Sequence, residues 1–161
     1  HERQLKAICA SVPPAKTPPA RVLIRPRRDT ASGLDAGFYM QPTLLEGAGP
    51  GAEVWETELF GPAPLIQHVS GFEDAIELAN RSPYGLTAAI HTTDVDRALT
   101  FVDRIQTGVA VINAGAHGSE PHMPFGGMKA SGNGTREPGT EALDVYSELR
   151  DVYVNVRPER V

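Results

Sequence analysis

The alternation of apolar segments between Leu65 and Ile112 constrains the fold of this chain more than any other feature. Leu65–Val69, Leu86–His91 and Val109–Ile112 have strand character, and two amphipathic helical patterns separate them. The run Val109–Ile112 is apolar throughout, as in a strand covered on both faces. This order is typical of a parallel sheet with flanking helices, so the sequence predicts an α/β fold.

Capping signals predict where the two helices begin. Ser70 and Glu73 match a capping box, with Glu73 reaching back to Ser70 as N-cap. Thr93 is the predicted cap of the second helix. The predicted inner face of that helix carries Val95, Ala98, Leu99, Val102 and Ile105.

Further elements flank this region. Leu5, Ile8, Cys9 and Val12 have the spacing of an amphipathic helix, which makes Cys9 a core residue rather than a nucleophile. Strands are expected at Arg21–Ile24 and, extended and broken by Pro42, at Phe38–Leu45, with a short helical turn at Ala52–Glu58. A helix over Thr140–Leu149, with Ala142, Leu143 and Tyr146 inward, and a strand over Val152–Val156 complete the chain.

Composition excludes several classes of partner. The 161 residues carry a net charge of −5 and a pI near 5.5, which argues against nucleic acid and anionic membranes. No apolar run approaches the ~20 residues that span a bilayer. One cysteine permits no internal disulfide, which favours the cytoplasm.

The stretch 113–134 is long and rich in glycine, and it follows the carboxyl end of a predicted strand, where α/β sheets bind ligands. It carries His117, Glu120 and His122, but their spacing matches no zinc pattern, so no metal site is predicted. The glycines match no phosphate-binding loop. Tight turns and pocket lining explain these residues better.

The turn Glu56–Pro62 is the second candidate for a site. Gly61-Pro62 forces a bend, and such a bend can hold Glu58 and Phe60 at the rim of a cleft. The carboxylate can accept hydrogen bonds from paired hydroxyls, and the ring can lie against a planar ligand.

Taken together, these motifs resemble the aldehyde dehydrogenase superfamily. The resemblance lies in the order and spacing of Gly37-Phe38-Tyr39-Met40-Gln41-Pro42-Thr43, Glu58-Leu59-Phe60-Gly61-Pro62, Asn80 with Tyr84-Gly85-Leu86, Gly108, Asn113, Pro124-Phe125-Gly126-Gly127-Met128-Lys129, Ser131-Gly132 and Arg136-Glu137 with Gly139. One departure is Thr135, which separates Gly134 from the Arg-Glu pair.

The resemblance covers the C-terminal third of a family member. It implies that residues 1–149 are the C-terminal part of a catalytic domain and that 150–161 form an oligomerisation arm joining identical subunits. It also implies that the nucleophilic cysteine and the general base lie upstream of residue 1, so this chain carries no catalytic residue and is expected to be inactive alone.

The family resemblance assigns roles to five residues. Glu58 would hold the nicotinamide-ribose hydroxyls and Phe60 would pack beside the nicotinamide of NAD or NADP, which binds only together with the N-terminal portion. Asn113, His117 and Phe125 would line the aldehyde entrance. The implied reaction oxidises an aldehyde to the carboxylic acid through a cysteine thioester, and the polar His117 favours a semialdehyde.

Two other functions remain open at this point. The chain could be a truncated segment that only self-associates through its terminal strand. It could also be an unrelated α/β module that binds a small molecule.

Overall fold

The computed structural model describes residues 1–12, 21–117 and 120–155. By its internal contacts the chain divides into two units, His1–Pro83 and Tyr84–Val161. Each unit has its own helices and strands, and each is described here by itself. Among the described residues, no helix is long and apolar enough to cross a membrane.

The first unit begins with helix α1, Glu2–Ser11, as the apolar spacing predicts. Ile8 and Val12 are its buried contacts, four residues apart on one face. The interpretation of Cys9 as a core residue is wrong, because Cys9 is only half-buried. It lies one position beyond Ile8, so the rotation of about 100° per residue turns it to the edge of the buried face.

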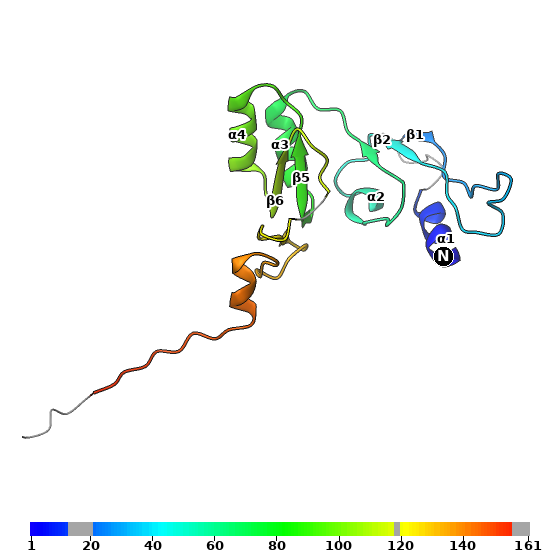
Figure 1. The fold of residues 1–161 in the computed structure, drawn as a ribbon. Coiled ribbons are helices and arrows are strands. Elements are labelled where there is room, and N and C mark those ends of the chain that lie inside the picture. Colours follow the sequence, from blue (N-terminus) through cyan, green and yellow to red (C-terminus); the bar gives the residue numbers. More distant parts are fainter. Residues whose placement is uncertain (13–20, 118–119, 156–161) are drawn as a thin grey trace, which may run out of the picture. The chain divides into compact units, whose positions relative to one another are not determined.

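The first unit also contains a small mixed sheet. Its strands are β1 (Arg21–Ile24), β2 (Leu44–Glu46) and β3 (Leu65–Ile66), in the order β1-β2-β3. β1 runs antiparallel to β2, and β2 runs parallel to β3 (Figure 1). The extended piece predicted from Phe38 becomes a strand only at Leu44, after Pro42, which cannot donate to a ladder.

Two helices complete the first unit, α2 at Glu53–Glu56 and α3 at Phe72–Asn80. The prediction that Ser70 is the N-cap of α3 is wrong. Gly71 is the N-cap residue, and the backbone N–H and the hydroxyl of Ser70 donate to the carboxylate of Asp74 at 2.9 and 3.0 Å. Because the helix starts at Phe72, Ser70 lies one position before the N-cap residue.

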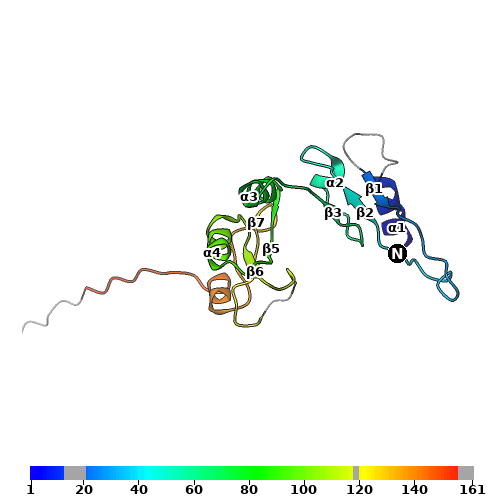
Figure 2. The same ribbon diagram turned by 90° about the horizontal axis from the view of Figure 1, so that it is seen from above.

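The second unit has a parallel pair at its centre. β5 (Thr87–Ile90) and β6 (Val109–Ile112) pair over four residues each, and helix α4 (Val95–Arg104) connects them (Figure 2). This confirms the predicted α/β class. A short antiparallel pair, β4 (Tyr84–Gly85) with β7 (Met128–Lys129), completes the strands. The described strands thus form three small sheets rather than one continuous sheet.

Helix α4 is rotated relative to the prediction. Asp94, not Thr93, is the N-cap, and its carboxylate accepts from the backbone N–H groups of Asp96 and Arg97. The buried residues are Ala98, Phe101 and Ile105. Three residues predicted to face inward are exposed instead, namely Val95, Leu99 and Val102.

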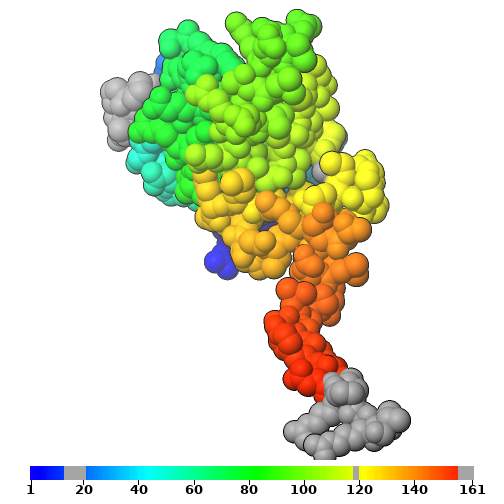
Figure 3. Space-filling view, turned by 90° about the vertical axis from the view of Figure 1, so that its left-hand side faces the viewer, coloured from blue at the N-terminus to red at the C-terminus, as the bar shows by residue number. Residues whose placement is uncertain are grey.

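In Figure 3 the orange and red end of the described chain extends away from the yellow and green part of the second unit. The helix predicted over Thr140–Leu149 is a 3₁₀ helix, η1, at Thr140–Val145. Its predicted inward residues Leu143 and Tyr146 are exposed. Residues 150–155 carry no strand in the described part of the chain, while Val156 and the rest of the predicted strand lie outside the described residues. The 149/150 domain boundary therefore stays a prediction.

Candidate functional site

The turn after α2 presents the first pair of predicted site residues, Glu58 and Phe60. α2 ends at Glu56, its C-cap residue Thr57 has an extended backbone, and the chain then turns through Phe60 with φ of +48°. A positive φ is uncommon for a bulky residue and is maintained only where the surroundings hold it. The Phe60 side chain is 73% exposed, and Glu58 is also exposed. Both functional groups are therefore accessible within this unit.

Two hydrogen bonds from distant segments of the chain position the backbone of this turn. The backbone N–H of Thr43 donates to the carbonyl of Pro62 at 2.8 Å, which joins the Pro-Thr motif to the Phe-Gly-Pro motif. The side-chain amide of Gln4 on α1 donates to the carbonyl of Leu59 at 2.8 Å. Both donors come from elements far away in sequence, so the turn is positioned by tertiary contacts.

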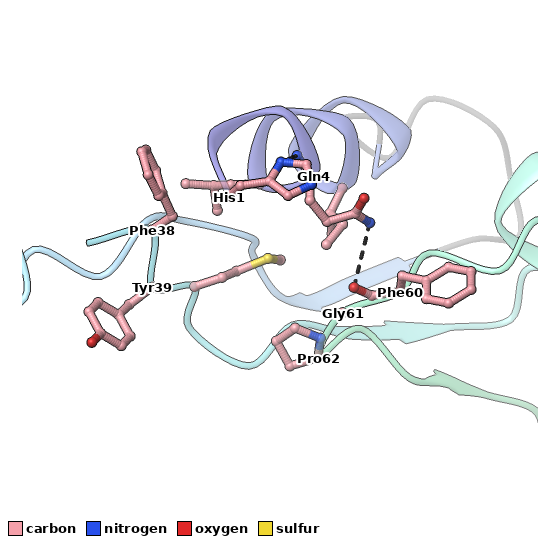
Figure 4. A pocket seen from close by; sticks show the side chains of 10 residues that line it. His1, Gln4, Phe38, Tyr39, Phe60, Gly61 and Pro62 are labelled. Carbon is pink, nitrogen blue, oxygen red and sulfur yellow. Dashed lines mark hydrogen bonds between the residues drawn. The ribbon is translucent and has the colours of Figure 1, made fainter.

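A pocket of about 260 Å³ lies beside the turn, on the side of α1. His1, Gln4, Leu5, Ile8, Phe38, Tyr39, Met40, Phe60, Gly61 and Pro62 line it. In Figure 4 the Phe60 ring points away from Tyr39 and Pro62.

Asn113 follows the last residue of β6 and clasps the ends of the parallel pair. Its side-chain oxygen accepts from the backbone N–H of Thr92 at 2.8 Å, and its side-chain nitrogen donates to the carbonyl of Thr92 at 2.9 Å. Its own N–H donates to Ile90, and its φ is +59°. Both ends of its amide thus bind backbone, which makes Asn113 an anchor for the loop that follows.

That loop approaches the strands closely through glycines. A Cβ at Gly108 would overlap the carbonyl oxygen of Gly126, and one at Gly127 would overlap Ser131. The Arg136 guanidinium donates to the carbonyl of Gly127 at 2.9 Å. Glycines are thus needed at these positions for close backbone approach.

Phe125 and His117 occupy different environments in this loop. Phe125 is half-buried, and its carbonyl accepts from the N–H of Glu137 at 2.8 Å. The His117 ring is exposed and lies over Gly115, where a side chain would collide with it. Residues 118–119, between His117 and Glu120, are outside the described chain. The described residues contain no group of three potential metal ligands.

The predicted site residues fall into two groups by unit. Glu58 and Phe60 belong to the first unit, and Asn113, His117 and Phe125 belong to the second. Gln4, which contacts Leu59 across 55 positions, was not among the residues predicted from the sequence. A half-buried glutamine on an amphipathic helix carries no local signal of such a contact.

Comparison with known proteins identifies the family of this chain. The model of the aldehyde dehydrogenase family matches residues 1–152. The chain belongs to the aldehyde dehydrogenase family. The resemblance read from the motifs is thereby confirmed, and an unrelated α/β binding module is excluded.

Relatives in this family have named activities. A benzaldehyde dehydrogenase [NAD(+)] from Pseudomonas putida is 36% identical over 158 residues, which cover 98% of this chain and 31% of that protein. An α-ketoglutaric semialdehyde dehydrogenase from Bacillus subtilis is 36% identical over 73% of this chain and 24% of that protein.

Solved structures of the family share the fold. A double mutant of betaine aldehyde dehydrogenase from Staphylococcus aureus, solved in complex with NAD+, superposes with a TM-score of 0.89 at 26% identity. The match covers 100% of this chain and 32% of that one. The chain therefore spans less than a third of the length of these aldehyde dehydrogenases.

Proposed function

We propose that this chain forms part of the active site of an NAD(P)-dependent aldehyde dehydrogenase that oxidises an aldehyde to the carboxylic acid. One observation carries the proposal. In a chain of this family, Glu58 and Phe60 are exposed on a turn whose unusual Phe60 backbone is held by contacts from behind. Such a turn orients a ligand without reacting with it.

The chemistry of the turn fits a nicotinamide dinucleotide. The Glu58 carboxylate accepts hydrogen bonds only, which suits the two adjacent hydroxyls of a ribose. The exposed Phe60 ring offers an apolar face to the nicotinamide side of the cofactor. When bound, nicotinamide supplies the hydride acceptor, while this chain holds the ribose and excludes water from one side. NAD is the first form to test and NADP the second.

The second unit would line the aldehyde entrance. Phe125, half-buried and tied to Glu137, supplies an apolar wall. His117 supplies an exposed imidazole that can meet a charged or hydroxylated substrate, which supports a semialdehyde. Asn113 would act through the loop it anchors, because its amide already binds Thr92.

The nucleophile and the general base are proposed to lie outside these 161 residues. Cys9 is the only cysteine, and it lies half-buried on α1. The proposed reaction proceeds through a cysteine thioester, so a thiolate from another part of the protein is required. The chain by itself is then expected to be inactive. A cytoplasmic location stays a prediction.

Replacement of Glu58 tests the proposed function. In the complete protein, Glu58→Gln is expected to slow hydride transfer by roughly 10- to 100-fold, because a misplaced acceptor loses near-attack geometry. Stopped-flow absorbance at the reduced-nicotinamide band measures this step, and an aldehyde deuterated at C1 identifies it. Glu53→Gln, an exposed glutamate on α2, is the matched control. Equal hydride-transfer rates in the wild type and Glu58→Gln would refute the assigned role.

A non-enzymatic segment that self-associates is the second candidate. The observation that favours it is the exposure of Val152, Tyr153 and Val154 near the end of the described chain. An extended apolar segment of this kind can add a strand to a second copy. Size-exclusion chromatography with a dehydrogenase assay on the isolated chain separates the candidates. NAD-dependent aldehyde oxidation by this polypeptide alone would contradict its expected inactivity.

A further inference from the structure

Gln4 on α1 contacts the peptide groups on both sides of Phe60. Its side-chain nitrogen lies 2.8 Å from the carbonyl oxygen of Leu59 and 3.5 Å from that of Phe60. Figure 4 shows the second of these contacts reaching from the helix to the turn. The first contact is part-buried and has good hydrogen-bond length, and the second is long.

The two carbonyls belong to successive peptide planes. The Leu59 carbonyl lies in the plane before the Cα of Phe60, and the Phe60 carbonyl lies in the plane after it. A donor that binds both restrains φ and ψ of Phe60 together, since only these two dihedrals relate the planes. Phe60 has a φ of +48°, which a residue of its bulk does not prefer on its own.

Neighbouring contacts fix α1 against the same turn. A Cβ at Gly61 would overlap Ile8, one helical turn beyond Gln4. The carbonyl of Pro62 is held by Thr43. These contacts position the turn after Phe60, whereas Gln4 binds the carbonyls on either side of the Phe60 Cα.

We propose that Gln4 is a positioning residue, which sets the backbone of Phe60 and with it the direction of the ring and of the neighbouring Glu58 carboxylate. The inference rests on the proposed function, because the ring and the carboxylate matter only if they bind the cofactor. It adds a residue that would act through the backbone of the turn. Loss of the amide donor frees the two peptide planes and lowers the fraction of molecules with the turn ready to bind.

The test uses the complete protein with three substitutions at Gln4. Gln4→Met keeps the length and removes the donor, Gln4→Glu keeps the size and offers only acceptors, and Gln4→Lys keeps a donor. Lys6→Met on the same helix is the control, since Lys6 pairs with Glu2 at the surface. If Gln4→Met does not fold, Gln4→Glu serves in its place, because it retains size and polarity.

Two readouts are expected to change together. In Gln4→Met, the KM for NAD rises by roughly five- to tenfold, the effect of one hydrogen bond, while the KM for the aldehyde stays constant. Hydrogen exchange of the peptide over 57–63 becomes faster in the cofactor-free protein. Gln4→Lys restores both values toward those of the wild type, and Lys6→Met changes neither.

The outcomes separate this inference from the proposed function. An inactive wild-type protein refutes the proposed function, and the exchange measurement then still tests the hold of Gln4 on the turn. An active wild type with unchanged KM for NAD in Gln4→Met overturns the inference. So does unchanged exchange over 57–63, or a loss of active protein with no change in KM, which is the result of a merely structural role.

Discussion

Ile8 and Gly61 approach so closely that a Cβ atom at Gly61 would overlap Cδ1 of Ile8. Ile8 is 3% exposed and belongs to the buried face of α1. Packing against the Ile8 side chain therefore favours glycine in the Phe-Gly-Pro motif, whereas backbone conformation does not, since the φ of Gly61 is not among the positive values.

Gly61→Ala is expected to destabilise the protein by about 1–3 kcal/mol, the usual effect of adding a carbon to a packed site. Ile8→Val removes the colliding Cδ1 carbon, at a cost of about 0.5–1.5 kcal/mol alone. The double mutant should lose less stability than the sum of the losses in the two single mutants. Urea denaturation of all four proteins measures this coupling, and strict additivity would contradict the contact.

Asn113 combines a left-handed backbone with a side-chain clasp on Thr92. Asn113→Ala loses the clasp and places an alanine at a φ of +59°. Asn113→Gly loses the clasp without the steric cost of a Cβ atom, so it should be milder by about 1 kcal/mol. Denaturation midpoints of the two variants test this order. An alanine variant as stable as the glycine variant would show that the backbone conformation changes on mutation.

Gly108 meets backbone rather than a flexible side chain, so its replacement cannot be absorbed locally. Gly108→Ala would bring Cβ against the carbonyl oxygen of Gly126, and a loss of about 3 kcal/mol or failure to fold is expected. Gly49→Ala is the control, because no atom lies within 4 Å of its added Cβ. It should change stability by less than about 1 kcal/mol. Thermal melts and soluble yield report both variants.

Asp74 makes the stability of the protein depend on pH. The backbone N–H and then the hydroxyl of Ser70 donate to its carboxylate, and these bonds lower the pKa of Asp74. Because the folded pKa lies below the unfolded value of about 4, the stabilisation is present above pH 4 and is lost as pH falls through the folded pKa.

Asp74→Asn should therefore flatten the acid side of the stability profile: it lowers stability near pH 7, where the carboxylate stabilises the fold, and has little effect near pH 2.5. Ser70→Ala removes only the hydroxyl donor and should flatten the acid side of the stability profile less than Asp74→Asn does. Denaturation midpoints between pH 2.5 and pH 7 measure the slopes. A wild-type slope in Asp74→Asn would contradict the contribution of this carboxylate.

The exposed residues Val152 and Val154 should matter for assembly. If the terminal segment adds a strand to a second copy, Val152→Asp and Val154→Asp each weaken association, because a charge then enters the contact. Asn155→Asp, on the alternate face, should leave it unchanged. Sedimentation velocity at several concentrations measures the effect. Identical concentration dependence in all variants would contradict strand addition by these residues.

Local patterns were sufficient for much of this protein. Helical spacing placed α1, α3 and α4, and the strands β1, β5 and β6 appear within their predicted ranges. The motifs around Glu58, Asn80 and Phe125 were sufficient to indicate the aldehyde dehydrogenase family, to which the chain belongs. These features depend on neighbours a few residues apart, so the order of residues alone specifies them.

Contacts between distant segments decided the rest. Whether Ser70 or Gly71 caps α3, and whether α4 buries Leu99 or Phe101, depends on a shift of one or two positions in the start and rotation of a helix. The hold of Gln4 on Leu59 and the need for glycine opposite Ile8 exist only after α1 packs on the turn. Sequence determined that Glu58 and Phe60 share a turn, and tertiary packing determined how that turn is held, because its restraints come from residues that the chain brings together only on folding.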